Sequence, residues 1–261
     1  IRDDIQNSDA EMILIFSTQW LSVIGHLVQA DPNPKWLHVD HDWYDLGDMP
    51  YEFIVDDQFS QILTDTHEEF NLESATVNYH GFPIDTGTIV ALKHINPDNT
   101  LPVSMVSCNM YAEKNESIVL GMAAKEALIK HGKKAAIVVV SSLSNRFFTH
   151  DINPEEDHIS SLKDDEWNKK VLDLLAQGRL EDVVECARDF AHDANADMKF
   201  KAIYWLAGVL GKNNKFSGEL FDYQSVWGTG NAILKLSESE IDYNQLDSRY
   251  KDFDELQIKK K

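Results

Sequence analysis

Six apolar residues at positions 135–140, with the sequence AAIVVV, constrain the fold more than any other part of the chain. An apolar run without alternation is typical of a strand buried on both faces, usually a central strand of a parallel or mixed sheet. The run ends in Ser141-Ser142-Leu143-Ser144-Asn145-Arg146. Because open sheets of this kind bind ligands beyond the carboxyl ends of their strands, we expect the functional site near Asn145.

Other predicted strands and helices alternate along the whole length. Residues 11–17 and 103–108 are apolar enough for buried strands, and residues 76–80 are a short strand candidate. A loop at 81–88 leads into a second apolar run at 89–92, and residues 223–236 are expected to form one closing strand, bent at Gly228 and Gly230. Helices are predicted at 57–70, 114–131, 164–176, 180–191 and 198–210.

This order of elements predicts the fold class. Strands that alternate with helices, without a linker between them, indicate an α/β protein with a central mixed or parallel sheet flanked by helices. The 261 residues are expected to form one domain, 1–261.

The formal net charge of −20 argues against nucleic acid or an anionic membrane as a partner, since either would require a basic surface. No apolar stretch approaches the roughly 18 residues of a membrane span, and no signal-peptide pattern opens the chain. Cys108 and Cys186 lie far apart and match neither a disulfide framework nor a zinc motif. We therefore expect a cytoplasmic protein with reduced thiols.

A loop dense in aromatic and acidic residues, HVDHDWYD at 38–45, offers an alternative site. His38 and His41, together with His80, are possible metal ligands, although their spacing matches no known metal motif. His26 is expected to be a packed or capping residue on a helix. Four aromatic residues either line a pocket for an aromatic ring or form a subunit interface, which is favoured: Trp20, Trp36, Trp43 and Tyr44.

Three segments together resemble the class III extradiol ring-cleaving dioxygenases, the group of protocatechuate 4,5-dioxygenase. They are STQW at 17–20, DTGTIVAL at 85–92 and VVVSSLSNR at 138–146, and the similarity extends over most of the chain. The resemblance implies the α/β fold of that family's catalytic subunit. It also implies cleavage of an aromatic ring by dioxygen at Fe(II).

The resemblance also identifies four positions at which the family carries functional groups. The family has an iron-ligating His at Gln19, a pocket-lining His at Thr86 and an acid/base His at Asn145, and its ligand Glu falls at or near Lys201. An amide is a weak substitute for imidazole and does not titrate near neutral pH, and a lysine places a cation where an anion must bind iron. The family's first ligand His would lie upstream of Ile1, so we expect that an N-terminal family segment is missing.

These departures imply a degenerate site, with no catalytic residue and no metal in this chain. Within the family, the pattern resembles the non-catalytic subunit of an enzyme whose homologous partner holds Fe(II). The implied substrate is 2-aminophenol, the product is 2-aminomuconate semialdehyde, and the assembly is an α2β2 heterotetramer. Two alternatives stay open: an independent metal enzyme that uses His38, His41 and His80, and a stand-alone module that binds an aromatic ligand.

Overall fold

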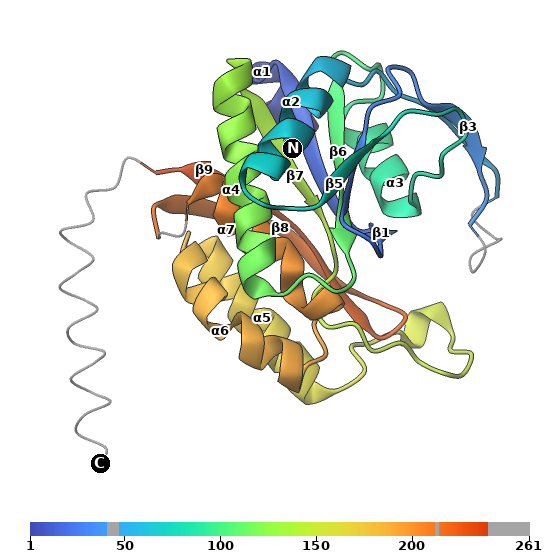
Figure 1. The fold of residues 1–261 in the computed structure, drawn as a ribbon. Coiled ribbons are helices and arrows are strands. Elements are labelled where there is room, and N and C mark those ends of the chain that lie inside the picture. The colour runs from blue at the N-terminus through green and yellow to red at the C-terminus, as the bar shows by residue number, and fades with distance from the viewer. Residues whose placement is uncertain (41–46, 212–213, 240–261) are drawn as a thin grey trace.

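A computed structural model describes residues 1–40, 47–211 and 214–239. Its centre is a five-stranded sheet with the order β5-β2-β6-β1-β7 (Figure 1). The strands are β1 (Met12–Ser22), β2 (His26–Gln29), β5 (Ser74–Val77), β6 (Val103–Asn109) and β7 (Ala135–Val140). β1 pairs in parallel with both β6 and β7, and β2 pairs in parallel with β5 and antiparallel with β6. The mostly parallel α/β sheet predicted from the sequence is confirmed.

β7, the apolar run that most constrains the fold, is an edge strand, so the prediction of a central strand is wrong. Among the described residues its sheet partner is β1, in a register from Met12 opposite Ala135 to Ser17 opposite Val140. Its six residues are only half-buried. Alternate residues pack on the two opposite faces of the sheet. A strand has a continuous apolar sequence when both faces of the sheet are covered. An edge strand and a central strand can therefore have the same sequence pattern.

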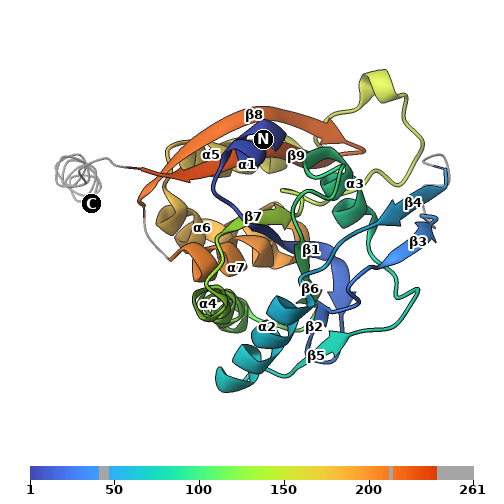
Figure 2. The ribbon, with the colours of Figure 1, turned by 90° about the horizontal axis from the view of Figure 1, so that it is seen from above.

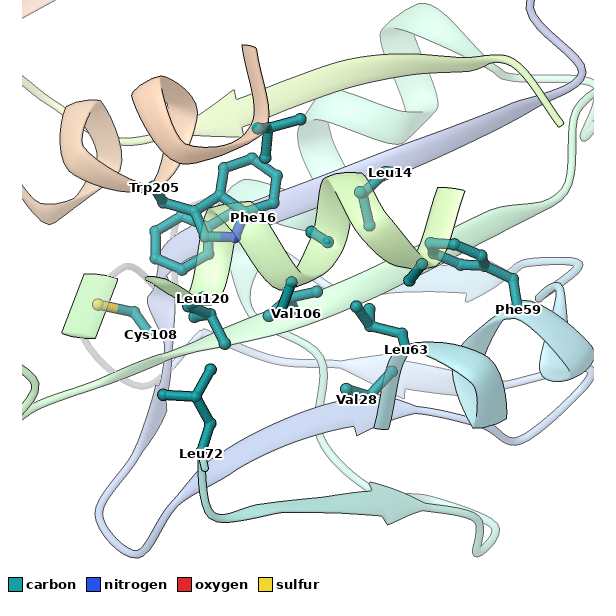
Figure 3. Packing of buried hydrophobic residues seen from close by; sticks show 14 of the residues in the cluster. Leu14, Phe16, Val28, Phe59, Leu63, Leu72, Val106, Cys108, Leu120 and Trp205 are labelled. Atoms are coloured by element: carbon teal, nitrogen blue, oxygen red, sulfur yellow. The ribbon is translucent and has the colours of Figure 1, made fainter. Parts of the chain in front are cut away.

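Three helices cover one face of the sheet: α2 (Asp57–Glu69), α4 (Lys114–His131) and α7 (Lys201–Leu210). In Figure 3 the core of this face joins Leu14 and Phe16 of β1 to side chains from these helices. Phe16 stacks on Trp205 of α7, with ring centroids 5.0 Å apart. α3 (Thr86–Ile95) packs on the other face, where Ile89 and Leu92 meet the odd-numbered residues of β1.

A second layer forms around α5 (Leu162–Ala176) and α6 (Leu180–Asp193), and Figure 2 shows the hairpin of β8 (Phe216–Val226) and β9 (Thr229–Glu238) running across α5. The single closing strand predicted at 223–236 is therefore wrong. Trp227 and Gly228 have φ values of 53° and 88°, and two successive positive φ values are typical of the tight turn that joins hairpin strands.

Several short elements differ from the sequence predictions. β3 (Lys35–His38) and β4 (Met49–Glu52) form a hairpin that the sequence pattern did not reveal. His26 lies on β2 rather than on a helix. The strand expected at 76–80 begins and ends earlier, at 74–77. The remaining short helices are α1 (Arg2–Asn7), η2 (Pro154–Glu156) and η3 (Asp197–Phe200). None of the helices in the described part of the chain is long and apolar enough to cross a membrane.

Candidate functional site

The candidate site lies where the parallel strands β1, β6 and β7 end, as the sequence around Asn145 predicts. β1 contains an irregularity there: Ser17 is opposite Ser107, but the next pair joins Leu21 to Cys108. Thr18, Gln19 and Trp20 therefore have no partner in the β6 register. Such bulges re-aim side chains next to functional sites. Here the bulge separates Thr18 and Gln19, which reach the site, from Trp20, which is buried in the core.

Gln19 is held by the first turn of α3. Its Oε1 accepts a hydrogen bond from the Gly87 backbone N–H at 3.0 Å. Asp85 caps α3, accepting from the Thr88 backbone N–H at 2.9 Å and from Ser17 Oγ at 2.8 Å. A Cβ atom added to Gly87 would lie 2.7 Å from Val140 Cγ1 and 2.8 Å from Gln19 Oε1. The DTGTIVAL segment therefore starts a helix rather than forming a loop, and its glycine allows close contact with β1 and β7.

Thr86 is tied to the β3–β4 region. His38 Nε2 lies 2.8 Å from Thr86 Oγ1, and the Thr86 hydroxyl donates to Asp40. Of the other two ligands of the alternative metal hypothesis, the structure describes only His80. His80 packs edge-on against Trp36, in a hollow formed by the β3–β4 hairpin, and His41 lies outside the described residues. Within the described ranges, no three His, Cys, Asp or Glu side chains are grouped to hold a metal ion.

Asn145 belongs to a network centred on Asp197, a residue that the sequence reasoning missed. Asp197 Oδ2 accepts hydrogen bonds from Thr18 Oγ1 at 2.5 Å and Ser141 Oγ at 2.9 Å, and Oδ1 accepts from Asn145 Nδ2 at 3.3 Å. One carboxylate thus joins the ends of β1 and β7. No local sequence signal marks Asp197, because its partners lie 52–179 residues away.

A left-handed turn precedes the fourth position, Lys201. Met198, Lys199 and Phe200 have φ values of 45°, 57° and 59°. Each such residue costs roughly 1–2 kcal/mol without the freedom of glycine, and strain of this kind is concentrated at functional sites. The helix predicted at 198–210 therefore begins only at Lys201, because a left-handed turn cannot continue into a right-handed helix.

The Lys201 ammonium is buried at the end of β6. The residue is 3% exposed, and Nζ donates to the backbone carbonyls of Asn109 and Met110, both at 2.6 Å. Burial lowers the pKa of Lys201, because water no longer solvates its charged form. A cation is therefore fixed inside the site, held by neutral acceptors.

The structure brings Gln19, Thr86 and Asn145 to one edge of the sheet and places Lys201 at the end of the neighbouring strand. Non-haem Fe(II) oxygenases bind their iron with two imidazoles and one carboxylate, which leave coordination positions open. The residues present do not fit that ion. Gly87 and Asp197 bind the amides of Gln19 and Asn145, and the Lys201 ammonium occupies the β6 carbonyls.

Of the aromatic residues expected at an interface, the structure describes Trp20 and Trp36, and the two differ in exposure. Trp20 is 6% exposed, donates from Nε1 to the Pro83 carbonyl at 3.0 Å and packs against Phe82, so its assignment to an interface is wrong. Trp36 is 52% exposed. Trp43 and Tyr44 lie outside the described residues.

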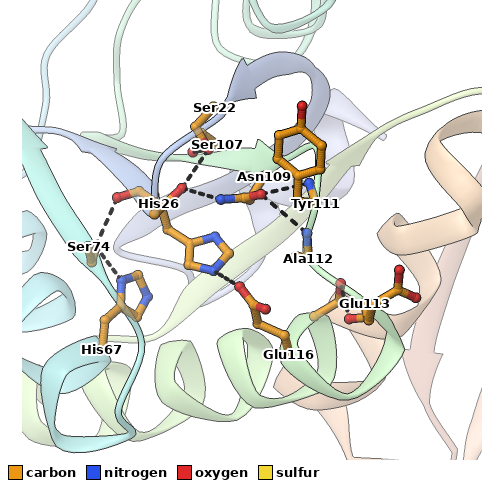
Figure 4. Close-up of polar contacts among 12 residues, drawn as sticks. Ser22, His26, His67, Ser74, Ser107, Asn109, Tyr111, Ala112, Glu113 and Glu116 are labelled. Atoms are coloured by element: carbon orange, nitrogen blue, oxygen red, sulfur yellow. Dashed lines mark hydrogen bonds and ion pairs between the residues drawn. The ribbon is translucent and has the colours of Figure 1, made fainter.

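A buried polar cluster lies behind the site, between β2, β5 and α4 (Figure 4). His26 Nε2 lies 3.0 Å from Glu116 Oε1, and His67 Nδ1 lies 2.8 Å from Ser74 Oγ. Burial lowers the pKa of His67 to about 3 and also lowers the pKa of His26. Both imidazoles are therefore neutral at pH 7, and neither is part of the predicted site.

Comparisons with known proteins find relatives over most of the chain. Residues 1–235 match the family model "Catalytic LigB subunit of aromatic ring-opening dioxygenase". The chain is 29% identical over 239 residues to the 2-aminophenol 1,6-dioxygenase alpha subunit of a Pseudomonas species, covering 91% of this chain and 88% of the relative. It is 28% identical over 245 residues to a Pseudomonas 2-aminophenol 1,6-dioxygenase beta subunit, covering 90% and 80%.

The fold also recurs in a crystal structure of an uncharacterized protein from Escherichia coli K12. That structure matches with a TM-score of 0.60 at 14% identity and covers 89% of each chain. The family model spans nearly all of the described elements, from α1 to most of β9. The chain belongs to the LigB family of aromatic ring-opening dioxygenases.

Proposed function

We propose that this chain is the non-catalytic subunit of a heteromeric extradiol dioxygenase that opens the ring of 2-aminophenol. A homologous subunit holds the Fe(II) and carries out the cleavage to 2-aminomuconate semialdehyde. The chain contributes no catalytic residue, and it stabilises the catalytic subunit or completes its substrate entrance. The proposed assembly is an α2β2 heterotetramer in the cytoplasm.

The observation that carries this proposal is the environment of Lys201. Its ammonium lies 2.6 Å from two backbone carbonyls and is almost fully buried, so it is a fixed part of the folded chain. A divalent cation placed nearby would meet a positive charge where the family supplies a negative one. The amides of Gln19 and Asn145 supply neither an imidazole ligand nor a titrating acid/base group.

The two most informative relatives support the heteromeric part of the proposal. One is named as the alpha subunit and the other as the beta subunit of 2-aminophenol 1,6-dioxygenase, and each alignment covers about nine tenths of this chain. A chain with a degenerate site is readily retained when a homologous partner does the chemistry, because packing against a partner does not require the old pocket.

The hydrogen bonds at the site suggest what its residues do in such a subunit. Asp197 joins the ends of β1 and β7, and Gln19 joins β1 to α3. Lys201 joins β6 to α7. These hydrogen bonds thus tie the ends of β1, β6 and β7 to the segments around them.

The alternatives have less support. His38, a ligand in the independent metal-enzyme hypothesis, is engaged with Thr86, and His80 lies with Trp36 on the β3–β4 hairpin. Trp20, one of the residues that could line a pocket for an aromatic ring in a stand-alone binding module, is buried and packs against Phe82.

The test compares this chain alone, the partner subunit alone and the two co-expressed, each assayed for iron content and for cleavage of 2-aminophenol. We expect this chain to be inert and iron-free, and the co-expressed pair to exceed the activity of the partner alone. Stoichiometric iron and ring cleavage in this chain alone would contradict the proposal. A pair no more active than the partner alone would contradict the stabilising role.

A further inference from the structure

Two loops at the carboxyl edge of the sheet expose large apolar side chains to solvent. The first segment comprises the last residues of β1 and the turn that leads to β2, and the second follows β6. Their exposed fractions range from 43% to 77%, whereas most side chains of this size in the chain are buried. The exposed residues, which we call the edge patch, are Leu21, Val23, Ile24, Met110 and Tyr111.

Hydrogen bonds hold the two loops together as one surface. The Met110 backbone N–H donates to the Ser22 carbonyl at 2.9 Å, and Asn109 Nδ2 donates to the Gly25 carbonyl at 2.7 Å. Figure 4 shows Tyr111 beside Asn109, near Ser22. The two segments that carry the edge patch are therefore joined directly to each other.

The second loop is also held in a fixed conformation. Asn109 Oδ1 accepts from the backbone N–H groups of Tyr111 at 2.8 Å and Ala112 at 3.2 Å. Lys201 Nζ also donates hydrogen bonds to the backbone carbonyls of Asn109 and Met110. A surface fixed in this way loses little conformational entropy on binding, which favours affinity. The lysine at the degenerate site thus shapes the loop that presents Met110 and Tyr111.

The size and chemistry of the edge patch indicate a protein partner. Five side chains at these exposures present roughly 500 Å², near the upper end for a monomer and well over half of the roughly 800 Å² that each partner buries in a standard interface. The segments LSVIG at 21–25 and NMYA at 109–112 contain no charge in a chain that is 26% charged. Glu113, two residues after Tyr111, forms an ion pair with Lys199 at 3.4 Å, and polar residues of this kind usually surround an apolar interface core.

We propose that the edge patch docks the homologous, iron-holding subunit, an inference that rests on the proposed function. The occupant is a subunit of the same fold, because this chain aligns with both subunit types of one two-subunit enzyme over about nine tenths of its length. An uncharged apolar surface on a chain of net charge −20 binds a partner through apolar burial. The degenerate site then lies directly beside the interface, with Lys201 bridging the two.

The test measures the affinity of the partner subunit for variants of the full chain by calorimetric titration. Ile24→Glu and Tyr111→Glu each place a charge in the edge patch, and we expect each to weaken binding by roughly 30-fold or more, as for an interface hot spot. Leu162→Glu is the matched control. Leu162 is 84% exposed at the start of α5, away from these loops, and binding should stay within about twofold of wild type. Thermal unfolding of each variant checks that it is folded.

Wild-type affinity in both edge-patch variants would overturn the proposal while leaving the proposed function intact, because the complex would still form. Loss of a homodimer of this chain, rather than of the mixed complex, would make a second copy the occupant and overturn it too. The proposal would also be overturned if the wild-type chain bound neutral phosphatidylcholine vesicles and Ile24→Glu abolished that binding. If the wild-type chain forms no complex with the partner, the proposed function fails, and this inference fails with it.

Discussion

Lys201→Met is the substitution that most directly tests the structural role proposed for Lys201. Methionine fills a similar volume, but it cannot donate a hydrogen bond to the carbonyls of Asn109 and Met110. The Asn109 carbonyl belongs to a residue that is 7% exposed, whereas Met110 is 43% exposed. The variant therefore leaves two acceptors without their donor at the end of β6.

The magnitude follows from two opposing effects. A buried polar group left unsatisfied costs about 1–3 kcal/mol, which is the cost expected for the Asn109 carbonyl; the Met110 carbonyl adds less, because Met110 is partly exposed to water. Methionine also removes the penalty for burying an ammonium, the same penalty that lowers the pKa of Lys201, and part of the loss is recovered. We expect a net decrease of about 2 kcal/mol in the free energy of unfolding, or a fall in Tm of roughly 4–8 °C.

The assay is urea unfolding and thermal unfolding of wild type and Lys201→Met at pH 7. Lys125→Met is the control, because Lys125 is exposed on α4, and its unfolding free energy should change by no more than about 0.5 kcal/mol. If Lys201→Met is as stable as wild type, the two hydrogen bonds do not hold the end of β6. The explanation given for the lysine would then be wrong.

Three further predictions address other parts of the site. Burial lowers the pKa of His67 to about 3, compared with 6.5 in the unfolded chain. The stability that neutral His67 contributes is therefore fully present above pH 6.5 and is lost as the pH falls toward 3. From pH 7 to pH 5, the unfolding free energy of wild type should fall by about 2 kcal/mol more than that of His67→Gln; equal falls would refute this. Gly87→Ala should destabilise by about 1–3 kcal/mol in urea unfolding, because its Cβ would meet Val140. The double variant with Val140→Ala should lose less than the sum of the single changes, and strict additivity would exclude the clash. Lys201→Glu should bind no iron in metal analysis, since the ligand position at Gln19 remains an amide; stoichiometric iron would contradict the interpretation of Gln19.

The sequence predicts the sheet and the edge that carries the site, but not the order of its strands. The apolar run at 135–140 indicates that both faces of the sheet are covered there. Its position at the edge follows from the pairing of β7 with β1, which the local sequence does not reveal. The hairpin of β8 and β9 was missed because its turn, Trp227-Gly228, lacks the usual Asn-Gly or Asp-Gly pair.

The site was predictable where the family motifs fall and unpredictable where the backbone departs from regular geometry. Gln19, Thr86 and Asn145 reach the expected edge. The left-handed turn before Lys201 could not be read from sequence, because Met198, Lys199 and Phe200 all favour ordinary right-handed or extended conformations.

The claim that this chain holds no iron is tested most directly by counting iron in the purified complex with its partner. The complex is loaded with Fe(II) under anaerobic conditions, and iron is measured per mole of each subunit. The account predicts one iron per partner subunit and none assignable to this chain, so that an α2β2 complex contains two. Four irons per such complex, or two that persist when the partner's iron ligands are removed, would contradict it.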